Sequence, residues 1–249
     1  MNVLTWNAFG LPFLPGRSDR LDDIRNSMLQ ENVKVAGLQE VLFGADVKQL
    51  STTNGYRAFH HPGMIFTKGA LVSVIEENFL PQEPKTEMHT YTKQGRWWRH
   101  PEQFFDRVAR KGFQASELYN QELGNFVFIN THLLCPSPEG NYQDPHLQSQ
   151  LAQLLEYVGQ RVQQKENVVL VGDLNFTRET PLYGQLTQRL QDCTPEAPGV
   201  DYILASEGIR CQEWDIFLIP LILENEVFSI PVITPELLLI SPLCKTQCL

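Results

Sequence analysis

The stretch VVLVGDLNF, Val168 to Phe176, decides the fold class. Its first four residues are valine or leucine, a composition that is typical of a buried strand. Gly172 follows, and Asp173 and Asn175 then bring a carboxylate and a carboxamide close together. In sheet-based enzymes, functional groups gather at one end of the strands, where the scaffold is rigid and the loops leave room for a ligand. Asp173 and Asn175 are therefore candidate functional residues.

Further apolar runs of strand length occur on both sides of this stretch: Val3–Trp6, Val35–Leu38, Ala70–Ile75, Phe126–Ile129 and Tyr202–Ala205. Helical patterns lie between them, and Ser18, Asp144-Pro145 and Thr180-Pro181 are expected to begin three helices. Strands and helices do not alternate strictly, because the centre from Ala70 to Leu134 is mostly strand and loop. The sequence therefore predicts a mixed α/β domain with more than one strand layer.

Three other apolar runs also lead into polar residues, at Asn7, Glu40 and His132. Together with Asp173 and Asn175, these strand ends can form one site, and their chemistry suits a phosphoester. Mg²⁺ takes one or two carboxylates and a phosphate oxygen, so Glu40 is a candidate metal ligand. Asn7 is expected to hold that carboxylate or a metal-bound water.

The remaining candidates suit the phosphate itself. His132 can donate a hydrogen bond to a phosphate oxygen as charge develops on it. Asp173 can orient or deprotonate an attacking water, and Asn175 can donate to the phosphate. Each residue also has an ordinary interpretation, since Asn and Asp at strand ends often form turns, a lone Glu is often a surface charge, and a lone His is often structural. Their joint occurrence after similar runs favours the functional interpretation.

Composition narrows the choice of partners. The 249 residues carry a formal net charge of -9, and Arg110-Lys111 is the longest basic run, which disfavours nucleic acid. The N-terminal residues show no secretory pattern, and the five cysteines are odd in number and irregularly spaced. We therefore expect reduced thiols and a cytoplasmic monomer.

The chain is expected to form a single domain over residues 1–249 with an atypical tail, 216–249. From Ile216 to Leu243 there is no Lys, Arg, His or Gly, and prolines and glutamates interrupt the apolar runs, which argues against a membrane span. In the segment GRWWRHPEQFF, Trp97 and Trp98 lie between arginines. This composition suits a loop that touches a bilayer interface, or equally a loop folded over the core by its aromatic residues.

Five ordered motifs resemble the endonuclease/exonuclease/phosphatase superfamily: TWN at Thr5–Asn7, LQEV at Leu38–Val41, NTHL at Asn130–Leu133, GDLN at Gly172–Asn175 and DYIL at Asp201–Leu204. The resemblance spans residues 2 to about 206. Within the superfamily, the segments ARKGF at Ala109–Phe113 and VDYILAS at Val200–Ser206 are most similar to the neutral sphingomyelinases.

The resemblance implies a four-layer α/β/β/α sandwich and Mg²⁺-dependent hydrolysis of a phosphate ester. For a sphingomyelinase, water attacks phosphorus and releases phosphocholine from ceramide. The resemblance implies that Glu40 binds the metal with Asn7 beside it. It places the following residues around the phosphate or the substrate: His132, Asp173, Asn175 and Lys111.

One motif of the family is missing. Its Ser-Asp-His motif supplies a general-base histidine, which pairs with the aspartate that corresponds to Asp201, but no histidine follows His146 in this chain. General acid–base help is typically worth about 10²- to 10⁴-fold, so the family's rate is not expected here. Three explanations remain open: an altered reading frame or splice produced the tail, the protein is an inactive lipid- or metal-binding homologue, or another group such as Asp173 is the base. A nuclease or a phosphoinositide phosphatase is the alternative enzymatic interpretation.

Overall fold

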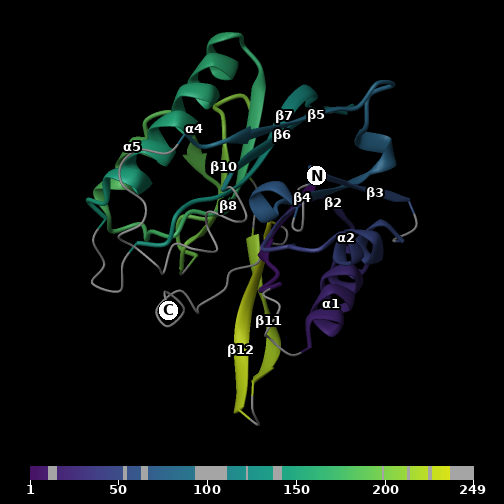
Figure 1. The fold of residues 1–249 in the computed structure, drawn as a ribbon. Coiled ribbons are helices and arrows are strands. Elements are labelled where there is room, and N and C mark those ends of the chain that lie inside the picture. The colour runs from purple at the N-terminus through teal and green to yellow at the C-terminus, as the bar shows by residue number, and fades with distance from the viewer. Residues whose placement is uncertain are drawn as a thin grey trace.

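The structure is a computed structural model that describes residues 1–10, 16–52, 55–62, 67–92, 111–121, 123–136, 142–197, 199–211, 214–223 and 226–235. In this part of the chain the strands form a four-stranded sheet, a six-stranded sheet and a separate two-stranded hairpin (Figure 1). Helices cover the outer faces of the two larger sheets. The expected α/β fold with more than one strand layer is therefore confirmed.

The four-stranded sheet has the order β1-β2-β4-β3, in which β1 and β2 are parallel and the other pairs are antiparallel. Leucine, isoleucine and methionine side chains of two helices pack on its outer face. The elements of this half are β1 (Asn2–Asn7), α1 (Arg17–Gln30), β2 (Val33–Gln39), α2 (Gly44–Ser51), β3 (Tyr56–His60), η1 (Lys68–Ala70), β4 (Val72–Glu76) and η2 (Glu77–Phe79).

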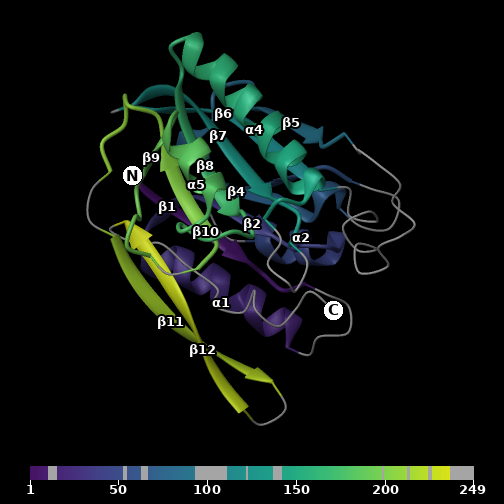
Figure 2. The same ribbon diagram turned by 90° about the vertical axis from the view of Figure 1, so that its left-hand side faces the viewer.

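The six-stranded sheet has the order β5-β6-β7-β8-β10-β9, with β7 and β8 parallel. The apolar stripe of its long helix, from Leu147 to Val158, and Leu182 and Leu186 of a shorter helix pack on its outer face. Figure 2 shows both helices lying over this sheet. The elements of this half are β5 (Lys85–Thr90), β6 (Gly112–Asn120), β7 (Gly124–His132), α4 (Pro145–Gln163), β8 (Asn167–Asp173), α5 (Pro181–Thr187), β9 (Gln191–Asp192) and β10 (Asp201–Ala205).

The inner faces of the two sheets meet in a core of their own, which contains Val3, Val35, Phe128 and Val171. Successive side chains of a strand point to opposite faces, so every second residue of β1, β7 and β8 points into this core. The last inward-facing residues of these strands are Asn7, His132 and Asp173, respectively. Alternation alone thus brings the polar strand ends to one edge of the core between the sheets.

Two of the three predicted helix starts are observed, and one is wrong. Asp144 caps α4 and accepts a hydrogen bond from the backbone N–H of His146 at 2.7 Å, and α5 begins at Pro181. The helix assigned to a Ser18 cap instead begins at Arg17, because Gly16 adopts the left-handed conformation at the N-cap position. The Ser18 hydroxyl lies within α1 and donates to Oε1 of Gln49.

The expectation of reduced thiols is wrong, because Cys135, Cys193 and Cys211 are all disulfide-bonded. Cys193, which follows β9, forms a disulfide with Cys211, which follows β10, across 18 residues of sequence. The odd count of cysteines concealed this pair, because the antiparallel pairing of β9 and β10 brings the two residues together only in the fold. The disulfide fastens the chain beyond β10 to the edge of the six-stranded sheet.

The first part of the atypical tail forms a hairpin of β11 (Trp214–Leu223) and β12 (Glu226–Pro235). The two strands pair only with each other in the described residues, and β12 passes beside β1. Both views show the hairpin extending away from the two sheets (Figures 1 and 2). None of the described helices is long and apolar enough to cross a bilayer.

Candidate active site

The four-stranded sheet contributes Asn7 and Glu40 to the candidate site. Glu40 directly follows β2 and has a φ of +56°, a left-handed value that is uncommon for a residue with a side chain. Its carbonyl oxygen accepts a hydrogen bond from the Gly10 N–H at 3.1 Å, and an ideal Cβ on Gly10 would lie 2.0 Å from that oxygen. The close approach of Gly10 therefore requires glycine and fixes the turn that presents the Glu40 carboxylate.

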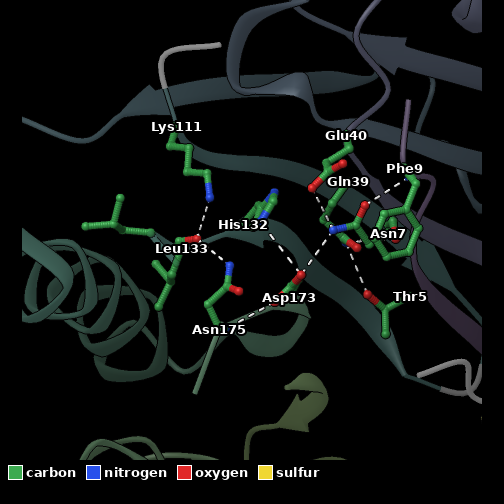
Figure 3. Close-up of polar contacts among 12 residues, drawn as sticks. Thr5, Asn7, Phe9, Gln39, Glu40, Lys111, His132, Leu133, Asp173 and Asn175 are labelled. Carbon is green, nitrogen blue, oxygen red and sulfur yellow. Dashed lines mark hydrogen bonds and ion pairs between the residues drawn. The ribbon is translucent and has the colours of Figure 1, made fainter. Parts of the chain in front are cut away.

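Asn7 joins the two halves of the site (Figure 3). Its Nδ2 atom lies 3.0 Å from Oε1 of Glu40 and 3.1 Å from Oδ2 of Asp173. Its Oδ1 atom accepts from the Phe9 N–H at 3.1 Å. If the Asn7 amide were flipped, its oxygen would face two carboxylates and its NH₂ group would face the Phe9 N–H. These contacts therefore fix the orientation of the amide. Asn7 thus offers hydrogens to the carboxylates, which fits the expectation that it holds Glu40.

The six-stranded sheet contributes His132 and Asp173, which are register partners on β7 and β8. Nε2 of His132 lies 3.7 Å from Oδ2 of Asp173, and both side chains are buried. Burial, with the charge of Lys111 as a smaller cause, lowers the pKa of His132 well below its ordinary value. His132 is therefore neutral near pH 7 and holds one N–H that can be donated.

Lys111 and Asn175 converge on one backbone carbonyl (Figure 3). Nζ of Lys111 donates to the Leu133 oxygen at 2.7 Å, and Nδ2 of Asn175 donates to the same oxygen at 2.8 Å. Asn175 has a φ of +56°, which asparagine tolerates better than most residues, and its N–H donates to Oδ1 of Asp173. The turn after β8 therefore aims the carboxamide back toward β7.

Asp201 begins β10 and is the register partner of Asp173 on the neighbouring strand. Directly paired residues project from the same face of a sheet, so Asp201 lies on the side of β10 that faces the other sheet. Its side chain is fully buried, and the Leu174 N–H donates to the carbonyl oxygen of Val200 beside it. Asp201 therefore lies next to the candidate site.

The donor set suits a hard divalent cation. The carboxylates of Glu40 and Asp173 both contact the side-chain amide of Asn7. Mg²⁺ is usually held by one or two carboxylates, water and substrate phosphate. Within the described residues, no group of three or more His, Cys, Asp or Glu side chains is placed to hold a metal ion by itself. Glu40 is a carboxylate that could hold such a cation, and Nδ2 of Asn7 lies within hydrogen-bond distance of it.

The structure brings together Asn7, Glu40, Lys111, His132, Asp173 and Asn175, and it places Asp201 on the adjoining strand. Trp97 and Trp98, the expected membrane contact, lie outside the described residues. Sequence reasoning missed the role of Arg20, a buried residue of α1. Its Nη2 donates to the Phe9 oxygen at 2.8 Å and its Nε donates to the Ala8 oxygen, which fastens the loop after Asn7. An arginine within the predicted helix, shortly after this loop, was the available signal.

Three solved structures illustrate the fold. Sphingomyelinase C from Streptomyces griseocarneus is 16% identical with a TM-score of 0.64, over 94% of this chain and 98% of that one. Truncated TDP2 from Caenorhabditis elegans is 15% identical with a TM-score of 0.67, over 94% and 95%. A beta toxin mutant from Staphylococcus aureus with bound magnesium ions is 16% identical with a TM-score of 0.65, over 92% and 94%. These likenesses establish the two-sheet fold.

A search of curated proteins found no sequence match for this chain. A family model does match: the model described as Endonuclease/Exonuclease/phosphatase family covers residues 4–223, which include all the candidate site residues. With its two mixed sheets, flanking helices and polar strand ends gathered at one edge, the chain belongs to the endonuclease/exonuclease/phosphatase family.

Proposed function

We propose that this protein is a Mg²⁺-dependent phosphodiesterase of the sphingomyelinase type, which hydrolyses sphingomyelin to phosphocholine and ceramide. The observation that supports it is the Asn7 amide, which joins Glu40 from one sheet to Asp173 from the other. In this proposal Glu40 is an oxygen ligand for the cation, and Asp173 is the carboxylate that acts on water. Lys111 and neutral His132 add donors for an anionic substrate on the same side.

When bound, Mg²⁺ would be held by Glu40 and would supply positive charge to a phosphate oxygen. His132 would donate its N–H to a second phosphate oxygen, and the Lys111 ammonium would add charge nearby. As the bond from the water oxygen to phosphorus forms, the bond from phosphorus to the ceramide oxygen breaks. The water passes a proton to a base, and the departing alkoxide takes up a proton from solvent to become the ceramide hydroxyl.

A base must receive the proton that the attacking water loses. No histidine follows His146, so the family's general base has no counterpart by sequence. We propose Asp173 for this role, because its carboxylate lies at the junction of the two halves and is oriented by the N–H of Asn175 at 3.0 Å. A carboxylate is a weaker base than imidazole, so turnover about 10²- to 10⁴-fold below that of a family member with the histidine is expected.

We also propose a peripheral contact with phospholipid surfaces through Trp97 and Trp98, a monomeric state and a cytoplasmic location. The net charge of -9 makes nucleic acid an unfavourable substrate. Because disulfides are rare in the cytosol, a cytoplasmic location requires Cys193 and Cys211 to be reduced in cells. Alkylation of free thiols in intact cells, followed by mass analysis of this cysteine pair, tests the location.

One buffer and one enzyme preparation should be used to compare three substrates with Mg²⁺: sphingomyelin in mixed micelles, an inositol phosphate and single-stranded DNA. The proposal expects phosphocholine release that chelation abolishes, and no comparable turnover of the other two. Faster turnover of DNA or inositol phosphate would instead select the alternative enzymatic function. If the folded protein hydrolyses none of them but binds sphingomyelin vesicles equally well before and after Glu40→Ala, it is a binding homologue.

A further inference from the structure

A layer of polar side chains lies directly beneath the candidate site, inside the core between the sheets. Thr5 on β1, Gln39 on β2 and Asn130 on β7 are completely buried. Each occupies an inward position that the alternation of its strand would otherwise fill with an apolar residue. Polar groups are costly to bury unless they are hydrogen-bonded, so the layer needs an account of its own.

Asn130 bridges the two sheets. Its Nδ2 atom donates to two carbonyl oxygens of the four-stranded sheet, those of Leu38 and Val72, each at 3.1 Å. Its Oδ1 atom accepts from Nε2 of Gln39 at 2.8 Å. Two carbonyls on one side and an amide N–H on the other leave a single orientation for this carboxamide. These hydrogen bonds therefore fix the position and orientation of the end of β7 relative to the end of β2.

Gln39 extends the bridge to the neighbouring strand. Its Nε2 atom also lies 3.1 Å from Oγ1 of Thr5 on β1 and 3.0 Å from the Gly37 oxygen of its own strand. The bridge thus connects all three strands that lead to Asn7, Glu40 and His132. It runs one inward position below Asn7 and His132, and next to Glu40 in the sequence.

Gly37 gives independent support, because it lets the sheets approach at this level. An ideal Cβ on Gly37 would lie 2.4 Å from Cγ2 of Val171 on β8 and 3.0 Å from Oδ1 of Asn130. A larger residue would clash with these two side chains, so at least one of them would have to shift. The sequence therefore combines a small residue, which allows the close approach, with two carboxamides, which define it.

We infer that Asn130 and Gln39 are positioning residues that set the separation and register of the two halves of the active site. The inference rests on the proposed function for its catalytic meaning. Stability alone does not require this bridge, since a buried polar pair can often be replaced by apolar residues of similar volume without loss. The bridge differs from apolar packing because its hydrogen bonds are directional. They fix the orientation of one sheet relative to the other, which packing between apolar side chains at these two positions would not do.

The test compares Asn130→Leu, Gln39→Met and the double variant, which replaces the bridge with apolar side chains of similar size. Ser73→Ala is the matched control. Ser73 also makes a buried hydrogen bond between the sheets, to Oε1 of Gln114 at 2.6 Å, but its strand β4 carries none of the candidate site residues. The measurements are Mg²⁺ affinity by calorimetry, kcat and KM separately, and the melting temperature.

We expect the double variant to melt at or above the temperature of either single variant, while its Mg²⁺ affinity stays 10- to 100-fold below that of the unmodified protein, the effect typical of losing support around a metal ligand. The bridge variants should also hydrolyse the substrate more slowly, through a lower kcat and not through a changed KM. Ser73→Ala should change only the melting temperature. Recovery of affinity together with stability in the double variant would overturn the inference. Gln39→Met alone decides the question if Asn130→Leu does not fold.

A readout that needs neither metal nor turnover separates this inference from the proposed function. The side-chain amide signals of Asn7 and Asn175 in ¹⁵N-correlation NMR spectra report whether the two halves of the site stay in contact. In the bridge variants we expect the Asn7 signal to shift or broaden as its bond to Asp173 loosens, and in Ser73→Ala we expect it to remain. An unchanged Asn7 signal in both bridge variants would contradict the positioning role, even if the protein proved not to bind Mg²⁺.

Discussion

Nδ2 of Asn7 lies 3.1 Å from Oδ2 of Asp173, and this hydrogen bond joins the four-stranded sheet to the six-stranded sheet at the candidate site. The two residues are 166 positions apart in the sequence. The same Nδ2 atom also reaches Glu40, so one amide group separates two carboxylates that would otherwise repel each other. A divalent cation bound at this place would add charge of the sign that both carboxylates require.

Replacing Asn7 with leucine, which has a similar volume, should lower the free energy of unfolding by about 1–3 kcal/mol, the usual effect of leaving buried polar groups unsatisfied. Chemical denaturation at pH 7 measures this loss. Asn2→Leu is the control, because Asn2 lies on the same strand and donates to one carbonyl, that of Glu31. A loss in Asn7→Leu no larger than the loss in Asn2→Leu would contradict this account.

Glu40→Gln should weaken Mg²⁺ binding by at least about tenfold, because it removes the charged oxygen ligand from the site. Calorimetric titration of the purified variant with MgCl₂ measures the affinity. Glu77→Gln, at an exposed position after β4, is the matched control and should bind as the unmodified protein does. Equal affinities for all three proteins would place the metal elsewhere.

The pH dependence of stability should carry the signature of His132. Its pKa is lowered by burial, so it stays neutral in the folded state while the same residue takes up a proton in the unfolded chain below about pH 6.5. The contribution of His132 to the free energy of unfolding is therefore fully present above that pH. Below it, the free energy of unfolding falls as the pH decreases, by up to about 1.4 kcal/mol per pH unit for one proton.

His132→Gln should reduce this slope by up to one proton. His60 and His61, whose pKa values burial also lowers, remain in both proteins and provide the residual slope. Urea titrations between pH 5 and pH 7.5 measure the two slopes. Identical slopes for the variant and the unmodified protein would show that His132 takes up its proton as readily in the folded state as in the unfolded chain.

The disulfide gives a prediction that is independent of the site. Replacing Cys193 and Cys211 with serine should lower the free energy of unfolding by about 2–4 kcal/mol, because a closed loop restricts the unfolded chain. A reductant should produce a similar loss in the unmodified protein and a smaller one in the double variant. If the reductant destabilises both proteins equally, the stabilising bond is not the one between these two cysteines.

Much of the site was predictable because alternation along a strand is a local rule. Asn7, His132 and Asp173 each end a run of inward positions, and their polar character is visible against the apolar residues that precede them. The bridge between Asn130 and Gln39 was not predictable in this way. Which carbonyls a buried amide meets depends on how the two sheets are placed, and no single strand carries that information.

The cysteine pair and the first helix show the same limit. Cys193 and Cys211 meet because β9 and β10 are antiparallel neighbours, whereas the sequence offered only an odd count. The first helix begins at Arg17 rather than after Ser18 because the left-handed Gly16 precedes it, and a serine near a helix start is a weaker signal than the backbone conformation of a glycine. The single-domain assignment and the roles of the site residues stay predictions.

Phosphocholine release from sphingomyelin micelles, measured for the unmodified protein and for Glu40→Gln with and without Mg²⁺, tests the central claim most directly. The account predicts slow release by the unmodified protein that requires Mg²⁺, and release by Glu40→Gln that is indistinguishable from the metal-free background. Circular dichroism should show that both proteins are folded. A folded, unmodified protein that releases no phosphocholine at saturating Mg²⁺, or a Glu40→Gln variant with full activity, would contradict it.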